Sequence, residues 1–129
     1  MSKASIFYSA GGLLSTVDDF YKYYQALNSY KLATKESLVK TRTSFKLVDG
    51  TDTGYGYGIQ VRELDGHKTV AHAGGGVGFY TMHWYFPDAG VHFIIFTNCD
   101  DYLKKDSIIF EMAKLSVEIG QKTPVPSKR

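Results

Sequence analysis

The stretch that decides the fold of this chain is HAGGGVGFYTMHWYFPDAGVHFIIFTN, residues 72–98. Two runs within it, 80–86 and 91–97, are rich in β-branched and aromatic residues, which is typical of β-strands. Between the runs lie Pro87, Asp88 and Gly90, which predict a turn. The runs do not alternate with polar residues, so we expect both faces of the two strands to be covered.

Glycine fills four of the five positions from 74 to 78, directly after His72 and Ala73. Because glycine weakens regular structure, such a run indicates either unusual backbone angles or the close approach of another group. A phosphate loop does not fit, because Phe79 stands where G-x-G-x-x-G needs its third glycine. An oxyanion site fits better, since glycines on a strand edge let a substrate carbonyl approach backbone N–H groups beside a basic residue.

The four histidines do not have the spacing of a metal site, because none belongs to an H-E-x-x-H motif. His83 and His92 lie in apolar strands, where a hydrogen-bonded core histidine is the common outcome. His67 lies beside a turn and is expected to be exposed. Cys99 is the single cysteine, which excludes an intrachain disulfide. We therefore expect no metal and no cofactor.

Two further strands are predicted upstream, over residues 54–64 and 67–74. Asp65-Gly66 between them is a strong signal for a two-residue hairpin loop. The four strands are therefore expected to form two antiparallel hairpins.

Two helices are predicted before the strands. The first covers residues 15–27, with Ser15 or Thr16 as its cap, and the second, shorter helix covers 34–41 with Thr34 as its cap. The apolar face expected for the first helix consists of Val17, Phe20, Tyr24 and Leu27.

The last helix is expected over residues 106–120, with Asp106 as its cap and Gly120 at its end. The apolar face expected for it consists of Ile108, Met112, Leu115 and Ile119. Residues 121–129 are expected to form a disordered tail. The order helix, helix, strands, helix predicts one α+β domain over residues 1–120, in which helices cover an antiparallel sheet.

The composition excludes several classes of function. The chain has 129 residues, of which 43% are hydrophobic, as in an ordinary single domain. Its net charge of +2 is too balanced to predict binding to nucleic acid or to an anionic membrane. No stretch approaches the roughly 20 apolar residues of a membrane helix. The first residues, MSKASIF, lack the apolar stretch of a signal peptide.

Three segments in this order resemble a known family: SAGGLLSTVDDFYKYYQAL at 9–27, GYGYGIQV at 54–61, and the stretch at 72–98. Together they are similar to the C-terminal half of the serine β-lactamase and penicillin-binding protein-like hydrolases. The class C β-lactamases and their esterase and peptidase relatives are the most similar branch. The resemblance implies a partial β-lactamase/transpeptidase-like fold. Relatives in this family are often exported.

In that family the third catalytic motif is Lys-Thr-Gly, often His-x-Gly in members that do not hydrolyse β-lactams. The resemblance implies that His72, Ala73 and Gly74 form this motif and that the N–H of Gly75 is one of two oxyanion donors. The implied catalytic residues are therefore His72, Gly74 and Gly75. The residues implied to line the substrate site are Tyr55, Tyr57, Ala73 and Gly76. An alternative for the two tyrosines is that they pack the hairpin.

His-Ala in place of Lys-Thr removes a permanent charge and a hydroxyl that usually help to hold a β-lactam carboxylate. The resemblance therefore favours a smaller ester, amide or peptide as substrate. The acylating motifs of the family, Ser-x-x-Lys and Tyr-x-Asn or Ser-x-Asn, belong to its N-terminal half. The only match here, Ser37 to Lys40, is interpreted as a turn of a surface helix, and neither Asn28 nor Asn98 completes the second motif.

The resemblance thus implies a chain that carries part of a serine hydrolase site and is inactive alone, so that an acyl substrate is expected only for the intact enzyme. One alternative is a non-catalytic binding or assembly module that retains half of the fold. Another is an unrelated small α+β protein, in which the glycine run is only a bulge and a turn. In the family the strand expected at 91–97 pairs with an N-terminal strand. We therefore expect a homo-oligomer that forms through this strand edge.

Overall fold

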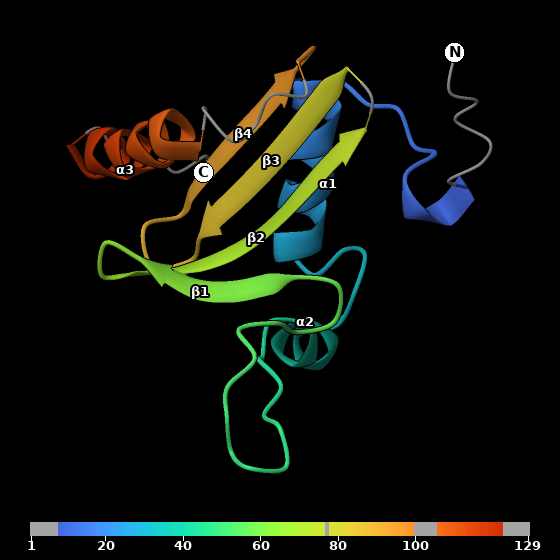
Figure 1. The fold of residues 1–129 in the computed structure, drawn as a ribbon, viewed down its shortest axis with the longest axis vertical. Coiled ribbons are helices and arrows are strands. Elements are labelled where there is room, and N and C mark those ends of the chain that lie inside the picture. The colour runs from blue at the N-terminus through green and yellow to red at the C-terminus, as the bar shows by residue number, and fades with distance from the viewer. Residues whose placement is uncertain (1–7, 77, 100–105, 123–129) are drawn as a thin grey trace.

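The computed structural model describes residues 8–76, 78–99 and 106–122. The described elements are, in chain order, η2 (Tyr8–Ala10), α1 (Val17–Asn28), α2 (Lys35–Thr41), β1 (Gln60–Leu64), β2 (His67–Gly76), β3 (Phe79–Phe86), β4 (Val91–Thr97) and α3 (Asp106–Lys122). The strands form one antiparallel sheet in the order β1-β2-β3-β4 (Figure 1). This arrangement confirms the predicted α+β class.

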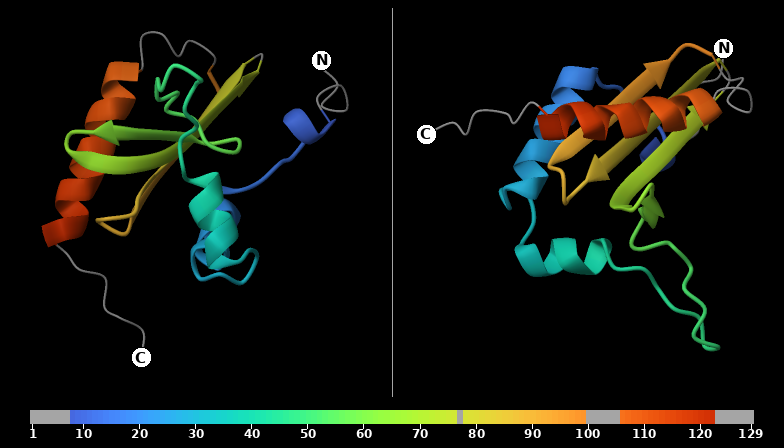
Figure 2. Two further views of the ribbon diagram at one scale, coloured as in Figure 1. Left: turned by 90° about the horizontal axis from the view of Figure 1, so that it is seen from below. Right: turned by 90° about the vertical axis from the view of Figure 1, so that its left-hand side faces the viewer.

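Helices α1 and α3 cover opposite faces of the sheet (Figure 2). Side chains alternate between the two faces along a strand, so neighbouring residues of β3 contact different helices. The His83 ring lies 5.5 Å from that of Phe20 in α1, whereas the Trp84 ring lies 4.9 Å from that of Phe110 in α3. Both faces of the apolar strands are therefore covered, as expected.

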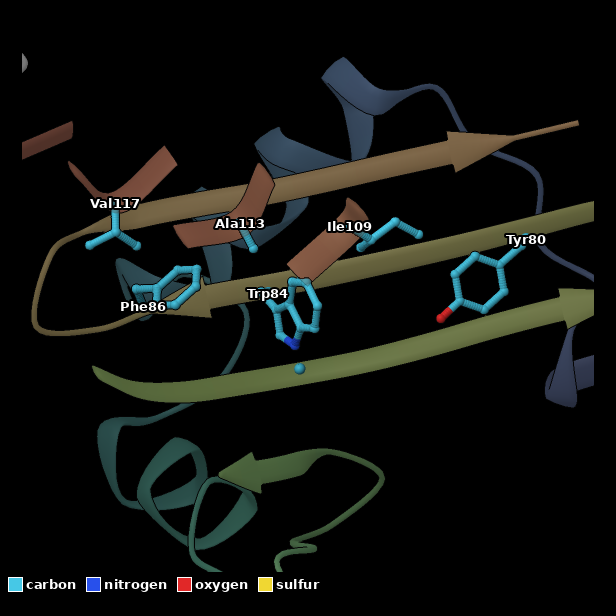
Figure 3. Packing of buried hydrophobic residues seen from close by; sticks show 7 residues of the cluster. Tyr80, Trp84, Phe86, Ile109, Ala113 and Val117 are labelled. Atoms are coloured by element: carbon cyan, nitrogen blue, oxygen red, sulfur yellow. The ribbon is translucent and has the colours of Figure 1, made fainter. Parts of the chain in front are cut away.

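The main apolar core lies between the sheet and α3 (Figure 3). Aromatic side chains of β3 fill the space between short side chains of β2 and the inner side of the helix. The buried members of this cluster are Ala71, Tyr80, Trp84, Phe86, Ile109, Ala113 and Val117. Burial of such side chains contributes about 1.5–3 kcal/mol for each large one.

The predicted apolar face of α3 is wrong. Ile109 is 3% exposed, but its neighbour Ile108 is 60% exposed. The other three residues of the predicted face are exposed as well: Met112, Leu115 and Ile119. Both stripes have helical spacing, so periodicity did not distinguish them. The sheet contacts the stripe that contains the small residue Ala113, which lets the helix approach closely.

The ends of α3 also differ from the prediction. Gly120 does not end the helix, which continues to Lys122. A Cβ on Gly120 would lie 2.5 Å from Cγ2 of Val91, so this glycine permits close packing against the start of β4. Asp106 is the first helical residue instead of the preceding cap. The tail expected from 121 onward lies outside the described residues after its first two positions, which are helical.

The helix caps before the sheet agree with the prediction. The Thr16 side chain accepts a hydrogen bond from the Asp19 N–H at 3.1 Å, so Thr16 and not Ser15 caps α1. Thr34 caps α2 in the same way. Of the expected face of α1, Tyr24 is buried, Phe20 and Leu27 are half-buried, and Val17 is exposed.

The first predicted strand is shorter than expected, because β1 begins at Gln60 and residues 54–59 form a loop. This loop lies against the end of α2: a Cβ on Gly56 would lie 2.1 Å from the carbonyl oxygen of Thr41. The alternation of tyrosine and glycine in this loop has the period of two that is typical of a strand, and this pattern led to the wrong prediction. The predicted hairpin loop is confirmed, since Asp65 and Gly66 have φ of 53° and 79°, both positive as in a type I′ turn.

Candidate functional site

The His-Ala-Gly segment lies where β2 extends beyond its neighbour β1. Strand β1 pairs with β2 only as far as Gln60 and Ala71, whereas β3 pairs with β2 from Val70 to Gly76. No described strand pairs with residues 72–76 on the side of β1 (Figure 1). We call this part of β2 the free edge. Strand edges of this kind present backbone N–H and C=O groups to other molecules.

Alternating hydrogen bonds determine which amides point outward from the free edge. The Val61 N–H donates to the Gly54 carbonyl at 2.8 Å, on the side of β1 that faces away from β2. Gln60 therefore directs its backbone toward β2 and its partner Ala71. Every second residue of β2 points the same way, so the backbone groups of Ala73 and Gly75 face the free edge.

The glycines of the free edge do not adopt unusual backbone angles, and only Gly76 lies under a contact too close for a Cβ. None of Gly74, Gly75 and Gly76 has a positive φ. A Cβ on Gly76 would lie 2.6 Å from Cζ of Phe79, whose ring covers this position. A Cβ on Gly75 would have no neighbour nearer than 3.4 Å. Gly75 is therefore the glycine with the most open surroundings of the three.

His72 projects an exposed imidazole at the start of the free edge. Its cross-strand partner is His83, so the His72 side chain lies on the sheet face that α1 covers farther along. Ala73 points to the opposite face, where it packs against the apolar core. The free edge thus combines one accessible imidazole with outward backbone donors, which suits a polarised carbonyl oxygen.

The two predicted tyrosines occupy different places. Tyr55 pairs with Gln60 in an isolated bridge, and Gln60 faces Ala71. Tyr55 therefore lies two strand spacings, about 10 Å, from the start of the free edge. The Tyr57 ring lies 4.8 Å from that of Phe45 within the loop, so the structure places it in loop packing.

Ser37 and Lys40 lie on α2, away from the free edge (Figure 1). The Ser37 hydroxyl accepts a hydrogen bond from the Thr34 hydroxyl at 3.1 Å, within the cap of the helix. Both side chains are exposed. The structure therefore does not bring this serine to His72.

A family model described as β-lactamase matches residues 2–114. The chain belongs to the β-lactamase family. Membership relates this β-lactamase-family chain to the serine hydrolases, in agreement with the three segments that carried the resemblance. No curated protein matches the chain.

A second polar cluster of this β-lactamase-family chain lies between α1 and the sheet. Arg42 Nη2 donates to Asn28 Oδ1, and Asn28 Nδ2 lies 3.1 Å from His92 Nε2. His92 Nδ1 lies 3.0 Å from His83 Nε2. We call these four residues the histidine relay. The prediction of a hydrogen-bonded core histidine is confirmed for His83, whereas His92 is hydrogen-bonded but half-buried. Nothing in the sequence indicated Asn28 or Arg42.

The donor-only guanidinium sets the direction of the relay. Because Arg42 can only donate, the Asn28 oxygen accepts and its amide nitrogen donates to Nε2 of His92. His92 then carries its proton on Nδ1 and donates it to His83. Burial lowers the pKa of His83 to about 3 and that of His92 to about 4, and the Arg42 charge adds to both shifts. Both imidazoles are therefore neutral at pH 7.

His67 is less exposed than predicted. This histidine, at the start of β2, is half-buried. Its Nδ1 lies 2.6 Å from Oδ2 of Asp88, which belongs to the turn between β3 and β4. This hydrogen bond lowers the pKa of the Asp88 carboxyl. Over residues 8–76, 78–99 and 106–122, no three His, Cys, Asp or Glu side chains gather closely enough to hold a metal ion. In the same residues, no helix has the length and apolar character needed to cross a membrane.

Proposed function

We propose that this chain supplies the oxyanion wall of a serine hydrolase that cleaves an ester, amide or peptide through an acyl-enzyme. One observation carries the proposal: Gly75 directs its backbone N–H from a free edge, with an exposed imidazole three residues before it. A carbonyl oxygen bound there would accept this hydrogen bond as negative charge develops on it. Family membership supports the reaction class.

The chemistry divides between this chain and residues outside it. A serine hydroxyl loses its proton to a lysine and attacks the acyl carbon, and the leaving group departs with a proton. Water then hydrolyses the acyl-enzyme and regenerates the serine. Both the serine and the lysine come from outside this chain, because Ser37 is engaged in the cap of α2. Gly74 and Gly76 leave the edge without side chains that would block a substrate, and Ala73 packs against the core behind it. Tyr55 and Tyr57 are not assigned contact with the substrate, because Tyr57 packs against Phe45 and Tyr55 lies about 10 Å from the start of the free edge.

The residues at the motif favour an uncharged or small acyl substrate. The resemblance implies that His72 and Ala73 stand at the positions where family members that bind β-lactams have lysine and threonine. An imidazole has no permanent charge at neutral pH. A carboxylate beside the acyl group would therefore gain less from this wall, so hydrolysis of β-lactams is not expected.

An active-site probe tests whether the chain is inert alone. A fluorophosphonate that labels activated serines is added to the purified chain, and mass spectrometry locates any label. We expect no serine to react faster than in the unfolded chain, because removal of a nucleophile and its base removes most of the rate enhancement. Labelling of Ser37 that disappears in Ser37→Ala would place the nucleophile in this chain and contradict the proposal.

The oxyanion donor is tested in the longer protein or complex that holds the serine. Gly75→Pro deletes the outward N–H, and proline is tolerated at an edge because that N–H does not join the ladder. We expect kcat to fall by about 10²–10³. Gly75→Ala keeps the N–H and is the matched control. Equal kcat for the two variants would show that Gly75 donates nothing to the reaction.

The alternative is a non-catalytic module that uses the same half of the fold for binding or assembly. The position of Ser37, which lies in the cap of α2 and not at the free edge, favours it. The nucleotide sequence upstream of the Met1 codon separates the two candidates. Ser-x-x-Lys and Tyr-x-Asn in the same frame would support the hydrolase, and their absence there would support the module.

Assembly is proposed to use the other edge of the sheet, as a homo-oligomer. No described strand pairs with β4 on its outer side, and every residue of β4 is half-buried. Apolar strand edges recruit further chains. We expect light scattering at tens of micromolar to report more than one chain per particle, and a monomer there would contradict this assembly.

A further inference from the structure

A hollow of about 220 Å³ lies between α2 and the first half of β2, away from the free edge. Its apolar lining includes Leu38, Val70 and Pro87, of which the first two are buried. Three cationic side chains also line it: Lys35, Arg42 and Lys68. None of its lining residues is acidic. We call it the basic hollow.

Within the part of the chain that the structure describes, the cations of the basic hollow form no close ion pairs, although Glu63 lies opposite Lys68 in the β1–β2 ladder. None of the ion pairs among the described residues involves Lys35, Arg42 or Lys68. The two lysines are exposed and can reorient, whereas Arg42 is held by Asn28 and lies 5.3 Å from the centre of the Tyr85 ring. Three like charges around one hollow repel one another and attract an anion.

The size and the lining limit the class of ligand. Pockets for drug-sized ligands have roughly 300–1,000 Å³, so this hollow suits a smaller molecule. Its apolar side chains suit a short hydrocarbon or aromatic body. Three cations match a group with two negative charges better than one with a single charge, and a guanidinium pairs well with phosphate oxygens.

We propose that the basic hollow binds a small phosphate monoester of an apolar alcohol or phenol. Lys35, Arg42 and Lys68 surround the phosphate, and Leu38, Val70 and Pro87 contact the apolar body. This site is separate from the oxyanion wall and does not depend on it, since the hollow lies at the opposite end of β2.

Arg42 connects the basic hollow to the histidine relay, which provides an internal reporter. Arg42 lines the hollow, and its guanidinium donates to Asn28. Asn28 is in turn connected to His83 through two hydrogen bonds, by way of His92. The Arg42 charge is one cause of the lowered pKa of His92. A dianion beside Arg42 offsets that charge, so the imidazole signals of the relay should move when the ligand binds.

A titration of the isotope-labelled chain with phenyl phosphate, followed by NMR, tests the proposal. We expect saturable binding with a dissociation constant near 1 mM, as is ordinary for so small a ligand. Backbone signals of α2 and the imidazole signals of the relay should shift together. Phenol should not bind, and benzoate and inorganic phosphate should each bind several-fold more weakly than phenyl phosphate.

Lysine variants locate the binding. Lys35→Gln and Lys68→Gln should each weaken phenyl phosphate binding about 2- to 5-fold. Both side chains are exposed, so the fold should be unaffected. Lys40→Gln is the matched control, because Lys40 is exposed on α2 but does not line the hollow. No saturation by about 10 mM, or equal losses in all three variants, would overturn the proposal. Equal affinity for phenyl phosphate and inorganic phosphate would overturn the role of the apolar body.

Discussion

The two faces of the sheet are stabilised in different ways, although the same strands build both. On the α3 face, Trp84 and Phe86 pack against apolar helix positions (Figure 3). On the α1 face, His83, the residue that precedes Trp84 in β3, joins a hydrogen-bonded relay that ends at Arg42. The first face depends on filled apolar volume, and the second depends on a particular protonation state.

The difference shows that a polar side chain can be buried as completely as an apolar one. His83 is 2% exposed, as well covered as Ile109 on the other face. Buried polar groups are tolerated when each has a partner, and the relay gives both histidines a donor or an acceptor. The consequence is a face whose stability changes with pH, opposite a face whose stability does not.

The largest effect is expected on the apolar face, from a matched pair of neighbouring isoleucines. Ile109→Ala should lower the free energy of unfolding by about 3–4 kcal/mol, because it leaves a cavity in the core. Ile108→Ala should change it by less than about 0.5 kcal/mol, since this side chain is exposed. Urea unfolding monitored by circular dichroism measures both. Equal losses would show that the two stripes of α3 are buried alike.

The next effect concerns the α1 face and pH. An unfolded histidine has a pKa of about 6.5, while burial lowers that of His83 to about 3 and that of His92 to about 4. At a pH between the folded and the unfolded pKa values, the unfolded chain binds more protons than the folded chain. The contribution of these histidines to the free energy of unfolding is therefore fully present above about pH 6.5 and decreases as the pH falls. We expect a loss of about 2–3 kcal/mol between pH 7 and pH 5, seen in urea unfolding at each pH.

Two variants sharpen this comparison of the faces. His92→Gln keeps an acceptor and a donor in the relay but does not titrate, so the pH dependence of stability should decrease by about half. Ile109→Ala should be less stable at every pH and keep the pH dependence of the parent chain. An unchanged pH dependence in His92→Gln would assign the titration to groups outside the relay.

A smaller effect tests how closely α3 approaches the sheet. Alanine in place of glycine normally stabilises a helix by about 1 kcal/mol. Gly120→Ala should instead destabilise by about 1–2 kcal/mol, because its Cβ would lie 2.5 Å from Val91 Cγ2 and valine is stiff. Thermal unfolding measures the change. If adding Val91→Ala to Gly120→Ala recovers none of the loss, then the clash with Val91 is not its cause.

The smallest effect is expected at the N-terminus of α1, the helix that covers the face with the histidine relay. Thr16→Ala removes the hydrogen bond to the Asp19 N–H and should cost about 1 kcal/mol. Ser15→Ala is the control, because Ser15 only donates to the neighbouring carbonyl and should lose less than about 0.5 kcal/mol. Chemical unfolding at pH 7 compares them. The reverse order would make Ser15 the cap.

Features that depend on neighbouring residues could be read from the sequence. Thr16 and Thr34 as caps, Asp65-Gly66 as a hairpin loop, and the two apolar strands after the glycine run all follow from local hydrogen bonding and side-chain alternation. These signals were sufficient for the α+β class. The His-Ala-Gly motif was also found in the sequence, and its catalytic role stays a prediction.

Features that depend on packing between distant segments were decided only by the tertiary structure. Periodicity offered two apolar stripes on α3, and contact with the sheet selected the one with Ala113 and Gly120. Strand β1 ends its pairing at Ala71, which exposes the free edge, because the preceding loop is held against α2. Asn28 meets His92 across 64 positions. Such pairings have no local signature, because the free energy that selects them arises only when separate elements pack together.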